Sequence, residues 1–151
     1  MEEKYLIYCD GGSRGNPGPA ASAFVVTNSE GKLIHSEGRY LGTETNNVAE
    51  YTAVLLAINW LTKQTEITNN QSLLLHSNKL QITINLDSQL VERQLNGKYK
   101  IKNENLKVLA GKIKLTIKNY DLKIEFVWGY REKNKLADSL VNETLDNASA
   151  R

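Results

Sequence analysis

The sequence predicts an α/β fold, in which one mixed β-sheet is flanked by helices. Three apolar segments between residues 4 and 42 are separated by short turns, which is typical of an antiparallel meander. After residue 45, helical and strand-like segments alternate, which adds helices and further strands to that sheet. Because the 151 residues contain no internal repeat and no flexible linker, we expect residues 1–151 to form a single domain.

The first predicted strand, residues 4–10 with the sequence KYLIYCD, is apolar on both of its alternating faces. This pattern predicts a central strand that is covered on both sides. The strand is expected to end at Asp10, where a stretch rich in glycine and proline follows, and residues 21–28 and 32–42 predict two further strands. Two interpretations of Asp10 compete: a hairpin whose acid shapes the turn, and a strand that carries a carboxylate to a reaction centre.

A long helix is predicted next, at residues 45–63. Thr45 or Asn46 can cap it, and because it is apolar almost all round, we expect it to pack on the sheet. Residues 63–79 predict a connection with a strand-like or helical insert. The later segments predict a strand at 80–87, a short helix at 88–95, a helix at 103–120, a strand at 121–128 and a helix at 134–148.

The last two long helices are predicted to be amphipathic. The helix at 103–120 has an apolar stripe with lysines elsewhere, formed by Leu106, Leu109, Ile113 and Ile117. For the final helix we expect Asn134 as the cap and an inward-facing set formed by Leu136, Leu140, Val141 and Leu145.

The composition indicates a cytoplasmic protein without a membrane partner. No apolar run approaches the ~20 residues that span a bilayer, and the acidic, briefly apolar start is a poor signal peptide. Cys9 is the single cysteine, so no internal disulfide is possible, and in a strand it is expected to be a small buried hydrophobe.

Positive charge is concentrated in one region, although the net charge is only +2. Residues 88–135 contain twelve Lys or Arg and five Asp or Glu. Two interpretations carry equal weight: an ordinary solvated face, and a surface that contacts a phosphate backbone.

Four acids lie on or beside apolar surfaces, where a solvated carboxylate has no reason to be: Asp10, Glu50, Asp87 and Asp138. Each has an ordinary alternative: a turn acid at Asp10, a helix cap at Asp87, and a favourable place near a helix N-terminus for Glu50 and Asp138. However, ligand sites in open α/β sheets form beyond the carboxyl ends of adjacent strands, where both aspartates are expected to emerge.

Acids gathered at one such edge repel each other, and a cation would offset that repulsion. Oxygen ligands without a Cys or His cluster select magnesium or manganese over zinc. A pair of these ions can activate a water and stabilise the leaving oxygen of a phosphodiester. The acids therefore predict a metal-dependent site for phosphoryl transfer.

Four segments of the chain together resemble type 1 ribonuclease H, in particular the compact form of archaea and many bacteria without a basic protrusion. They read YCDGGSRGNPGPA, TNNVAEY, LDSQLVERQLNGKYKIKN and REKNKLADSL, in the order of that family and over nearly the whole chain. The resemblance implies a ribonuclease H-like fold with a five-stranded mixed sheet. It also implies an endonuclease that cuts the RNA strand of an RNA/DNA hybrid.

The same resemblance assigns roles to residues. Asp10, Glu50, Asp87 and Asp138 match the four metal-binding catalytic acids of the family. Two Mg²⁺ ions, for which Mn²⁺ can substitute, then position a water for in-line attack and leave a 5′-phosphate and a 3′-hydroxyl. Further matches imply contacts to the substrate at Gly11, Gly12, Asn16, Thr45, Asn46, Asn47, Gln89 and Asn134. A missing Cβ at the two glycines is expected to let the backbone approach a sugar.

The chain departs from many relatives in the loop after the last strand. Those relatives carry a mobile His there, whereas this chain has only His35 and His76, both elsewhere. Arg131 or Glu132 are candidates for a comparable role in the loop.

A second departure concerns the DNA strand. Thr43 stands where relatives often have a phosphate-binding Arg, so we expect binding to depend more on Lys98, Lys100 and Lys102 and to weaken with salt. No obligate protein partner is indicated, and a monomer is expected. Two alternatives stay open: a non-catalytic nucleic-acid-binding domain, and a nuclease that acts mainly on double-stranded RNA.

Overall fold

The computed structural model describes residues 3–67, 80–129 and 134–150. One sheet has the strand order β3-β2-β1-β4-β5, and its strands are β1 (Glu3–Ser13), β2 (Gly18–Asn28), β3 (Leu33–Glu44), β4 (Leu80–Leu86) and β5 (Ile124–Trp128). The first three strands are antiparallel neighbours, whereas β4 pairs parallel to β1 and β5 parallel to β4. The predicted five-stranded mixed sheet with a central first strand is therefore confirmed.

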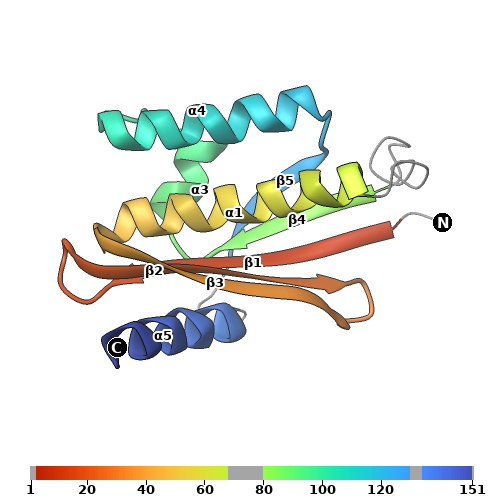
Figure 1. The fold of residues 1–151 in the computed structure, drawn as a ribbon. Helices are drawn as coiled ribbons and strands as arrows, with labels where there is room; N and C mark the ends of the chain where they lie inside the picture. Colours follow the sequence, from red (N-terminus) through yellow and green to blue (C-terminus); the bar gives the residue numbers. More distant parts are fainter. Residues whose placement is uncertain (1–2, 68–79, 130–133, 151) are drawn as a thin grey trace.

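Helices cover the two faces of the sheet unequally (Figure 1). They are α1 (Asn46–Ile67), α3 (Gln89–Leu95), α4 (Glu104–Asn119) and α5 (Lys135–Ser149). Helix α1 lies directly on the sheet, α4 lies on the outer side of α1, and α5 covers the opposite face (Figure 1). Helix α1 is apolar almost all round because it is packed between the sheet and α4, with Tyr51, Val54, Ile58 and Leu61 fully buried.

A smaller core lies under α5. Ala21 and Ala23 of β2 pack against Val141 and Leu145, so small side chains on the sheet face leave room for the helix. Leu140 is partly buried there, but Leu136 is 66% exposed, so its predicted inward position is wrong. The inward line of α5 runs instead through its buried Ala137, one helical turn before Val141.

The first strand is longer than predicted. Instead of ending at Asp10, β1 continues through Gly11 and Gly12 to Ser13, which pairs with Ala20 of β2. Asp10 thus lies inside the strand and is 8% exposed, and the turn begins only after Ser13. The prediction of a sharp turn directly after Asp10 is wrong, because small side chains at 11–13 stay in the ladder.

Several other boundaries differ by a few residues. Helix α1 extends to Ile67, beyond the predicted end at 63, and the insert expected within 63–79 lies largely outside the described residues. Strand β5 begins at Ile124 rather than at Asp121, whose φ of 50° interrupts an extended backbone.

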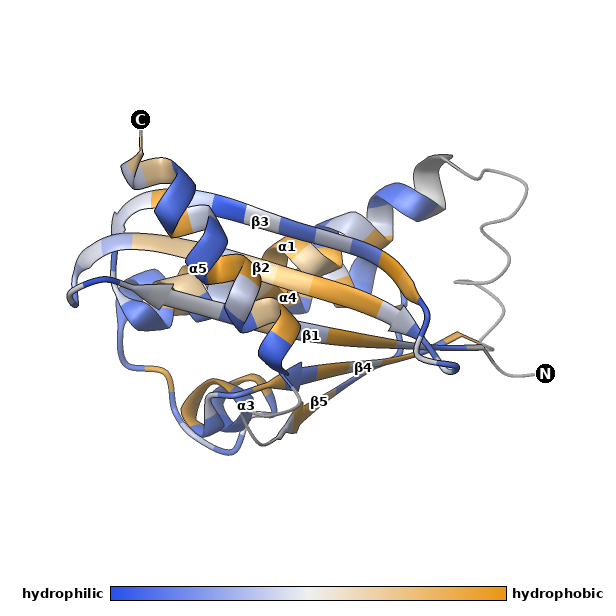
Figure 2. Ribbon diagram, turned by 90° about the horizontal axis from the view of Figure 1, so that it is seen from below, coloured by the Kyte–Doolittle hydropathy of each residue, from blue (hydrophilic) through white to orange (hydrophobic). Residues whose placement is uncertain are grey.

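The hydropathy of the chain follows these layers. Apolar residues concentrate along β1, β2 and β4 inside the sheet, whereas the edge strand β3 is largely hydrophilic (Figure 2). Cys9 is buried at 2% exposure, as predicted. Among the described residues, no helix combines the length and apolarity needed to cross a membrane.

Candidate active site

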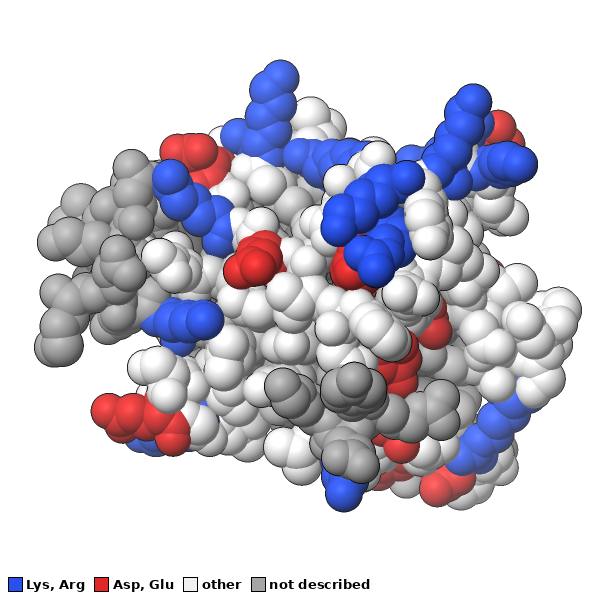
Figure 3. Space-filling view, turned by 180° about the vertical axis from the view of Figure 1, so that it is seen from behind, with Lys and Arg blue, Asp and Glu red and all other residues white. Residues whose placement is uncertain are grey.

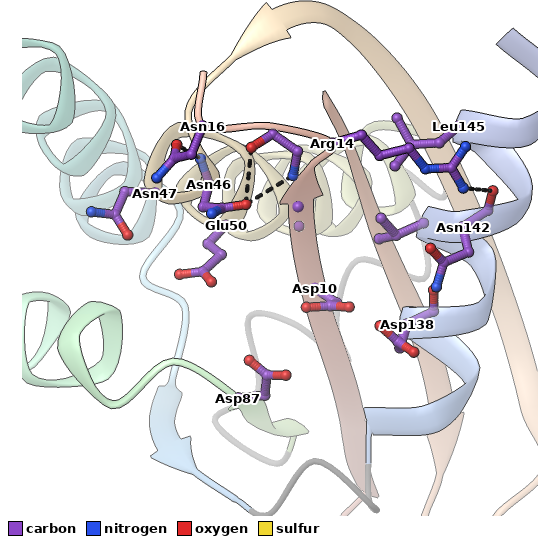
Figure 4. A pocket seen from close by; sticks show the side chains of 14 residues that line it. Asp10, Arg14, Asn16, Asn46, Asn47, Glu50, Asp87, Asp138, Asn142 and Leu145 are labelled. Carbon is purple, nitrogen blue, oxygen red and sulfur yellow. Dashed lines mark hydrogen bonds between the residues drawn. The ribbon is translucent and has the colours of Figure 1, made fainter. Parts of the chain in front are cut away.

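All four predicted acids line a single cavity of about 480 Å³ (Figure 4). Asp10 comes from β1, Glu50 from the second turn of α1, Asp87 from the residue after β4, and Asp138 from the first turn of α5. The cavity therefore lies at the carboxyl ends of two adjacent parallel strands, β1 and β4. The sequence-based prediction that Asp10 and Asp87 emerge at one edge of the sheet is confirmed.

Asp87 is positioned by contacts of its own backbone and of the residue that follows it. The indole nitrogen of Trp128 donates to the Asp87 carbonyl oxygen at 3.2 Å. Ser88, not Asp87, caps helix α3, because the Ser88 hydroxyl accepts from the backbone N–H of Val91 at 3.2 Å. The alternative reading of Asp87 as a helix cap is therefore wrong, and its carboxylate lines the cavity instead.

The start of α5 is tied directly to the central strand. The Asn134 side-chain amide donates to the Cys9 carbonyl oxygen at 2.7 Å, one residue before Asp10. Asn134 is the N-cap residue of α5, as predicted, but it is 3% exposed and its side chain makes no capping bond, because it is turned to Cys9 instead. The contact holds the first turn of α5, and with it Asp138, beside the strand that carries Asp10.

Burial and mutual repulsion change the protonation of Asp10. The pKa of Asp10 is raised to about 8, mainly by burial and then by the charges of Asp87, Asp138 and Glu50, while a hydrogen bond from the Gly11 backbone N–H opposes the shift. The carboxyl is thus hard to ionise until a positive charge offsets its neighbours.

Glu50 is shifted in the same direction. The pKa of Glu50 is raised to about 7, mainly by burial and also by the charge of Asp87, while a hydrogen bond from Ser88 opposes the shift. Its Oε2 atom is buried without a hydrogen-bond partner, which is costly for a carboxylate oxygen.

The donor set fits a hard divalent cation. Four carboxylates face the cavity, one with an unpartnered buried oxygen, and oxygen ligands of this kind suit Mg²⁺ or Mn²⁺. Within the described ranges, no three His, Cys, Asp or Glu side chains are already gathered into a compact metal-binding group. The four acids line one cavity without forming such a group.

Amide side chains form the upper rim of the cavity in Figure 4. Asn16 Oδ1 accepts from the Asn46 backbone N–H at 3.0 Å. Asn46 Oδ1 accepts from the backbone N–H of Ser13 at 2.9 Å and from its hydroxyl at 3.0 Å. Because both oxygens are engaged within the protein, the amide nitrogens are the groups offered to a ligand. Asn47 lines the same cavity.

Gly11 and Gly12 both line the cavity, but a Cβ would meet different surroundings at the two positions. A Cβ at Gly11 would overlap the backbone of Ala49 in α1, so this glycine is needed for the helix to approach the strand. A Cβ at Gly12 would meet only Val141, at 3.9 Å. Open space for the expected close approach of a substrate therefore exists at Gly12 and not at Gly11.

The remaining predicted site residues do not line the cavity or lie outside the described residues. Thr45 caps α1, since its hydroxyl accepts from the Val48 backbone N–H at 3.2 Å. Gln89 is the exposed first residue of α3, and neither residue lines the cavity. Arg131 and Glu132 lie outside the described residues.

The sequence reasoning missed Arg14 and Asn142. Arg14 follows β1, its guanidinium reaches Asp146 of α5 at 2.6 Å, and both Arg14 and Asn142 line the cavity. The signal that could have found Arg14 was a single cation within the small-residue stretch GGSRGNPGP.

The predicted lysines occupy the connection between α3 and α4. This connection is anchored by its backbone: the Lys98 N–H donates to the Arg93 carbonyl oxygen at 2.8 Å. The Gln94 amide reaches the Lys100 carbonyl oxygen at 3.4 Å and accepts from the Tyr51 hydroxyl at 2.7 Å. Figure 3 shows Lys and Arg gathered along the α4 side of the molecule, with some Asp and Glu among and below them.

The mixed sheet with helices on both faces defines an α/β protein. Its candidate active site is a cavity lined by four carboxylates at the carboxyl ends of β1 and β4. The family model described as RNase H matches residues 2–146, and the chain belongs to the RNase H family.

Individual relatives agree with this family. Ribonuclease HI of Halobacterium salinarum is 33% identical over 145 residues, which cover 93% of this chain and 64% of that protein. A bifunctional protein of Mycobacterium tuberculosis is 31% identical over 147 residues. The chain spans 36% of the length of this second relative.

Solved structures of related proteins have the same fold. LC11-RNase H1, isolated from compost by a metagenomic approach, is 38% identical with a TM-score of 0.85, and the match covers 98% of this chain and 99% of that one. The structure of LC11-RNase H1 in complex with an RNA/DNA hybrid matches with a TM-score of 0.83 and covers 95% of this chain and 98% of that one.

Proposed function

We propose that the protein is an endoribonuclease that hydrolyses the RNA strand of RNA/DNA hybrids. The observation that carries this proposal is the convergence of Asp10, Glu50, Asp87 and Asp138 in one cavity of an RNase H fold. A second observation supports the choice of substrate, because LC11-RNase H1, with a TM-score of 0.83 to this chain, binds an RNA/DNA hybrid. We further propose that residues 1–151 act as one monomeric, cytoplasmic domain.

The four acids would hold two divalent ions, Mg²⁺ or Mn²⁺. When bound, such ions supply Lewis-acid stabilisation of the phosphodiester and lower the pKa of an attacking water. The chain's own contribution is to hold four oxygen ligands on rigid elements, two of them at strand β1 and directly after strand β4. The proposed products are a 5′-phosphate on one fragment and a 3′-hydroxyl on the other.

Asp10 and Glu50 are the residues whose charge state depends most on a bound cation. In the absence of a compensating charge, Asp10 is largely protonated at neutral pH and Glu50 is about half protonated, because the pKa of Asp10 is raised to about 8 and that of Glu50 to about 7. Loading the site would release these protons and turn each carboxyl into a ligand.

The rim of the cavity suits the minor groove of a hybrid. The amide nitrogens of Asn16 and Asn46 are available as donors, because their oxygens accept bonds within the protein. Acceptor atoms are present on both A·T and G·C pairs in the minor groove, so amide donors there bind without choosing a sequence. Gly12 leaves space for a sugar and its 2′-hydroxyl, which would distinguish RNA from DNA.

The proposal is tested with end-labelled RNA/DNA hybrid, double-stranded RNA and double-stranded DNA, each incubated with Mg²⁺, Mn²⁺ or chelator. We expect internal cuts in the RNA strand of the hybrid with either metal, and none in chelator. Products that ligate only after addition of a 5′-phosphate would contradict the proposed end chemistry.

The same assay separates the alternatives. Hybrid binding without cleavage in either metal would make the chain a non-catalytic binding domain. Faster cleavage of double-stranded RNA than of the hybrid would replace the proposed substrate. Cleavage that persists in chelator or in Asp10→Asn would contradict a metal-dependent site.

A further inference from the structure

Arg14 occupies an unusual position in the acid-lined cavity. Among the described residues that line it, Arg14 is the only Lys or Arg, alongside four carboxylates. It lies just after β1, where its backbone N–H donates to the Pro19 carbonyl oxygen at 2.8 Å, so the base of the residue is fixed. Its side chain is 44% exposed and can therefore change partner without unfolding the turn.

The guanidinium of Arg14 is engaged by α5 in this structure. Its Nη2 atom lies 2.6 Å from Asp146 Oδ1. The same atom lies 3.4 Å from the Asn142 carbonyl oxygen (Figure 4). Asp146 does not line the cavity, and its side chain is 68% exposed. An ion pair this exposed is weak, because water and salt screen both charges.

A phosphate is a better partner for this guanidinium than one exposed carboxylate. Arginine binds phosphate through two parallel, charge-assisted hydrogen bonds, and the hybrid would bring phosphates to the rim of this cavity. We propose that Arg14 is a phosphate-binding residue and that Asp146 competes with the hybrid for it. This inference rests on the proposed function and adds to it a pair of residues that tune affinity for the substrate.

The competition predicts opposite effects of two substitutions. Arg14→Ala removes the phosphate contact, so Kd and KM for the hybrid rise about tenfold while kcat changes little. Asp146→Asn removes the competitor, so Kd falls by about two- to fivefold. In the double variant, the gain from Asp146→Asn disappears, because Asp146 acts only through Arg14.

Glu143→Gln is the matched control. Glu143 is an exposed acid of the same helix, so this change removes one negative charge without touching the Arg14 contact. The effect of Asp146→Asn must exceed that of Glu143→Gln, which measures the general effect of surface charge.

The decisive experiment measures hybrid binding in chelator and steady-state cleavage in Mg²⁺ for the four variants and the wild type, over a range of salt. A phosphate contact also predicts that Arg14→Ala reduces the slope of log Kd against log salt by about one, which a purely structural role would not do. Hybrids that carry one neutral methylphosphonate link, placed in turn along each strand, identify the phosphate that Arg14 contacts. When the neutral link replaces that phosphate, Arg14→Ala should no longer weaken binding of the hybrid.

Two outcomes would overturn the inference. Weaker binding in Asp146→Asn would make the pair a structural tie between the turn and α5. If the affinity gained by Asp146→Asn persists when Arg14 is also replaced, the gain is a general effect of surface charge and not a competition for Arg14. Either result in a protein that still cleaves hybrids leaves the proposed function intact, whereas absence of cleavage by the wild type would count against the function itself.

Discussion

The acid-lined cavity and the lysine-bearing connection between α3 and α4 differ in the sign of their charged groups and in how far these are buried. The cavity gathers four carboxylates at the carboxyl ends of β1 and β4, and burial holds the pKa of Asp10 at about 8. The connection carries exposed Lys98, Lys100 and Lys102, each surrounded by solvent. Charges around the buried Asp10 interact more strongly because less water surrounds them, whereas charges on the connection are screened.

This difference suits the two regions to different roles, the cavity to the reaction and the connection to attraction of the nucleic acid. A reaction on a phosphodiester needs charge that is fixed, close and incompletely solvated. Strand β1, the residue after β4, the second turn of α1 and the first turn of α5 provide it. Attraction of a polyanion needs only charges that face solvent, and it tolerates loss of any one of them. Substitutions in the cavity should therefore have large, individual effects, and substitutions on the connection small, additive ones.

The largest expected effect is on cleavage. Asp10→Asn keeps the size of the side chain and removes a proposed metal ligand, so we expect kcat for hybrid cleavage to fall by about 10³-fold or more. Single-turnover cleavage of a labelled hybrid in Mg²⁺ measures the change. Glu30→Gln, in the turn between β2 and β3, removes an exposed acid outside the cavity and should keep wild-type activity. Equal losses in both variants would remove the distinction between the two regions.

The two cavity glycines should differ in stability. Gly11→Ala places a methyl group into the backbone of Ala49, and we expect the free energy of unfolding to drop by about 3 kcal/mol or more. Gly12→Ala meets no such obstacle and serves as the control, with a much smaller loss. Urea denaturation of both variants measures the difference. A Gly11→Ala protein as stable as Gly12→Ala would contradict the tight approach of α1 to β1.

The acids of the cavity should make stability depend on pH. The folded pKa values of Asp10 and Glu50, about 8 and about 7, exceed their ordinary values of 3.8 and 4.5. Between these limits the unfolded chain has released protons that the folded chain keeps. The stabilising contribution is therefore complete below about pH 4 and is lost as pH rises through 7 to 8.

Asp10→Asn isolates this effect. In chelator the variant should gain stability over the wild type as pH rises from 4 to 8, by an amount on the order of a few kcal/mol, and the gain should vanish at pH 4. Thermal or urea unfolding across this pH range measures it. Glu143→Gln, an exposed acid on α5, should show no such trend. A constant difference between Asp10→Asn and wild type at all pH values would contradict the raised pKa.

The lysines should have the smallest effects. Lys98→Ala, Lys100→Ala and Lys102→Ala should each raise Kd for the hybrid by about two- to fivefold and lower the salt slope by about one. Fluorescence anisotropy with a labelled hybrid in chelator measures both quantities. Lys32→Ala, in the turn before β3, is the matched control. Affinity that stays flat between low and moderate salt would contradict any role of these lysines in binding phosphates.

The sequence predicted the parts of this molecule that local patterns control. Apolar residues on both faces of the first strand placed β1 at the centre of the sheet. Carboxylates beside apolar runs identified all four acids of the cavity. Both features follow from the periodicity of strands and helices and from the rule that sites form beyond the carboxyl ends of strands.

The errors came from contacts between distant segments. The extension of β1 past Asp10 depends on pairing of Gly11–Ser13 with β2, and no local pattern reveals that Gly11 lies under α1. Leu136 was placed inward because its type is apolar, but the position of α5 on β2 leaves it exposed. The bond from Asn134 to the Cys9 carbonyl joins residues 125 positions apart and is likewise invisible in the sequence.

The central claim, that the buried carboxyls exchange protons for a divalent cation, is tested most directly by titrating Mn²⁺ into the protein by calorimetry at several pH values. Repeating each titration in buffers of different ionisation enthalpy gives the number of protons released per ion. We predict binding that releases about one proton or more at pH 7, fewer at pH 9, and fewer in Asp10→Asn at pH 7. Binding that releases no protons, or that is equally strong and equally proton-linked in Asp10→Asn, would contradict the claim.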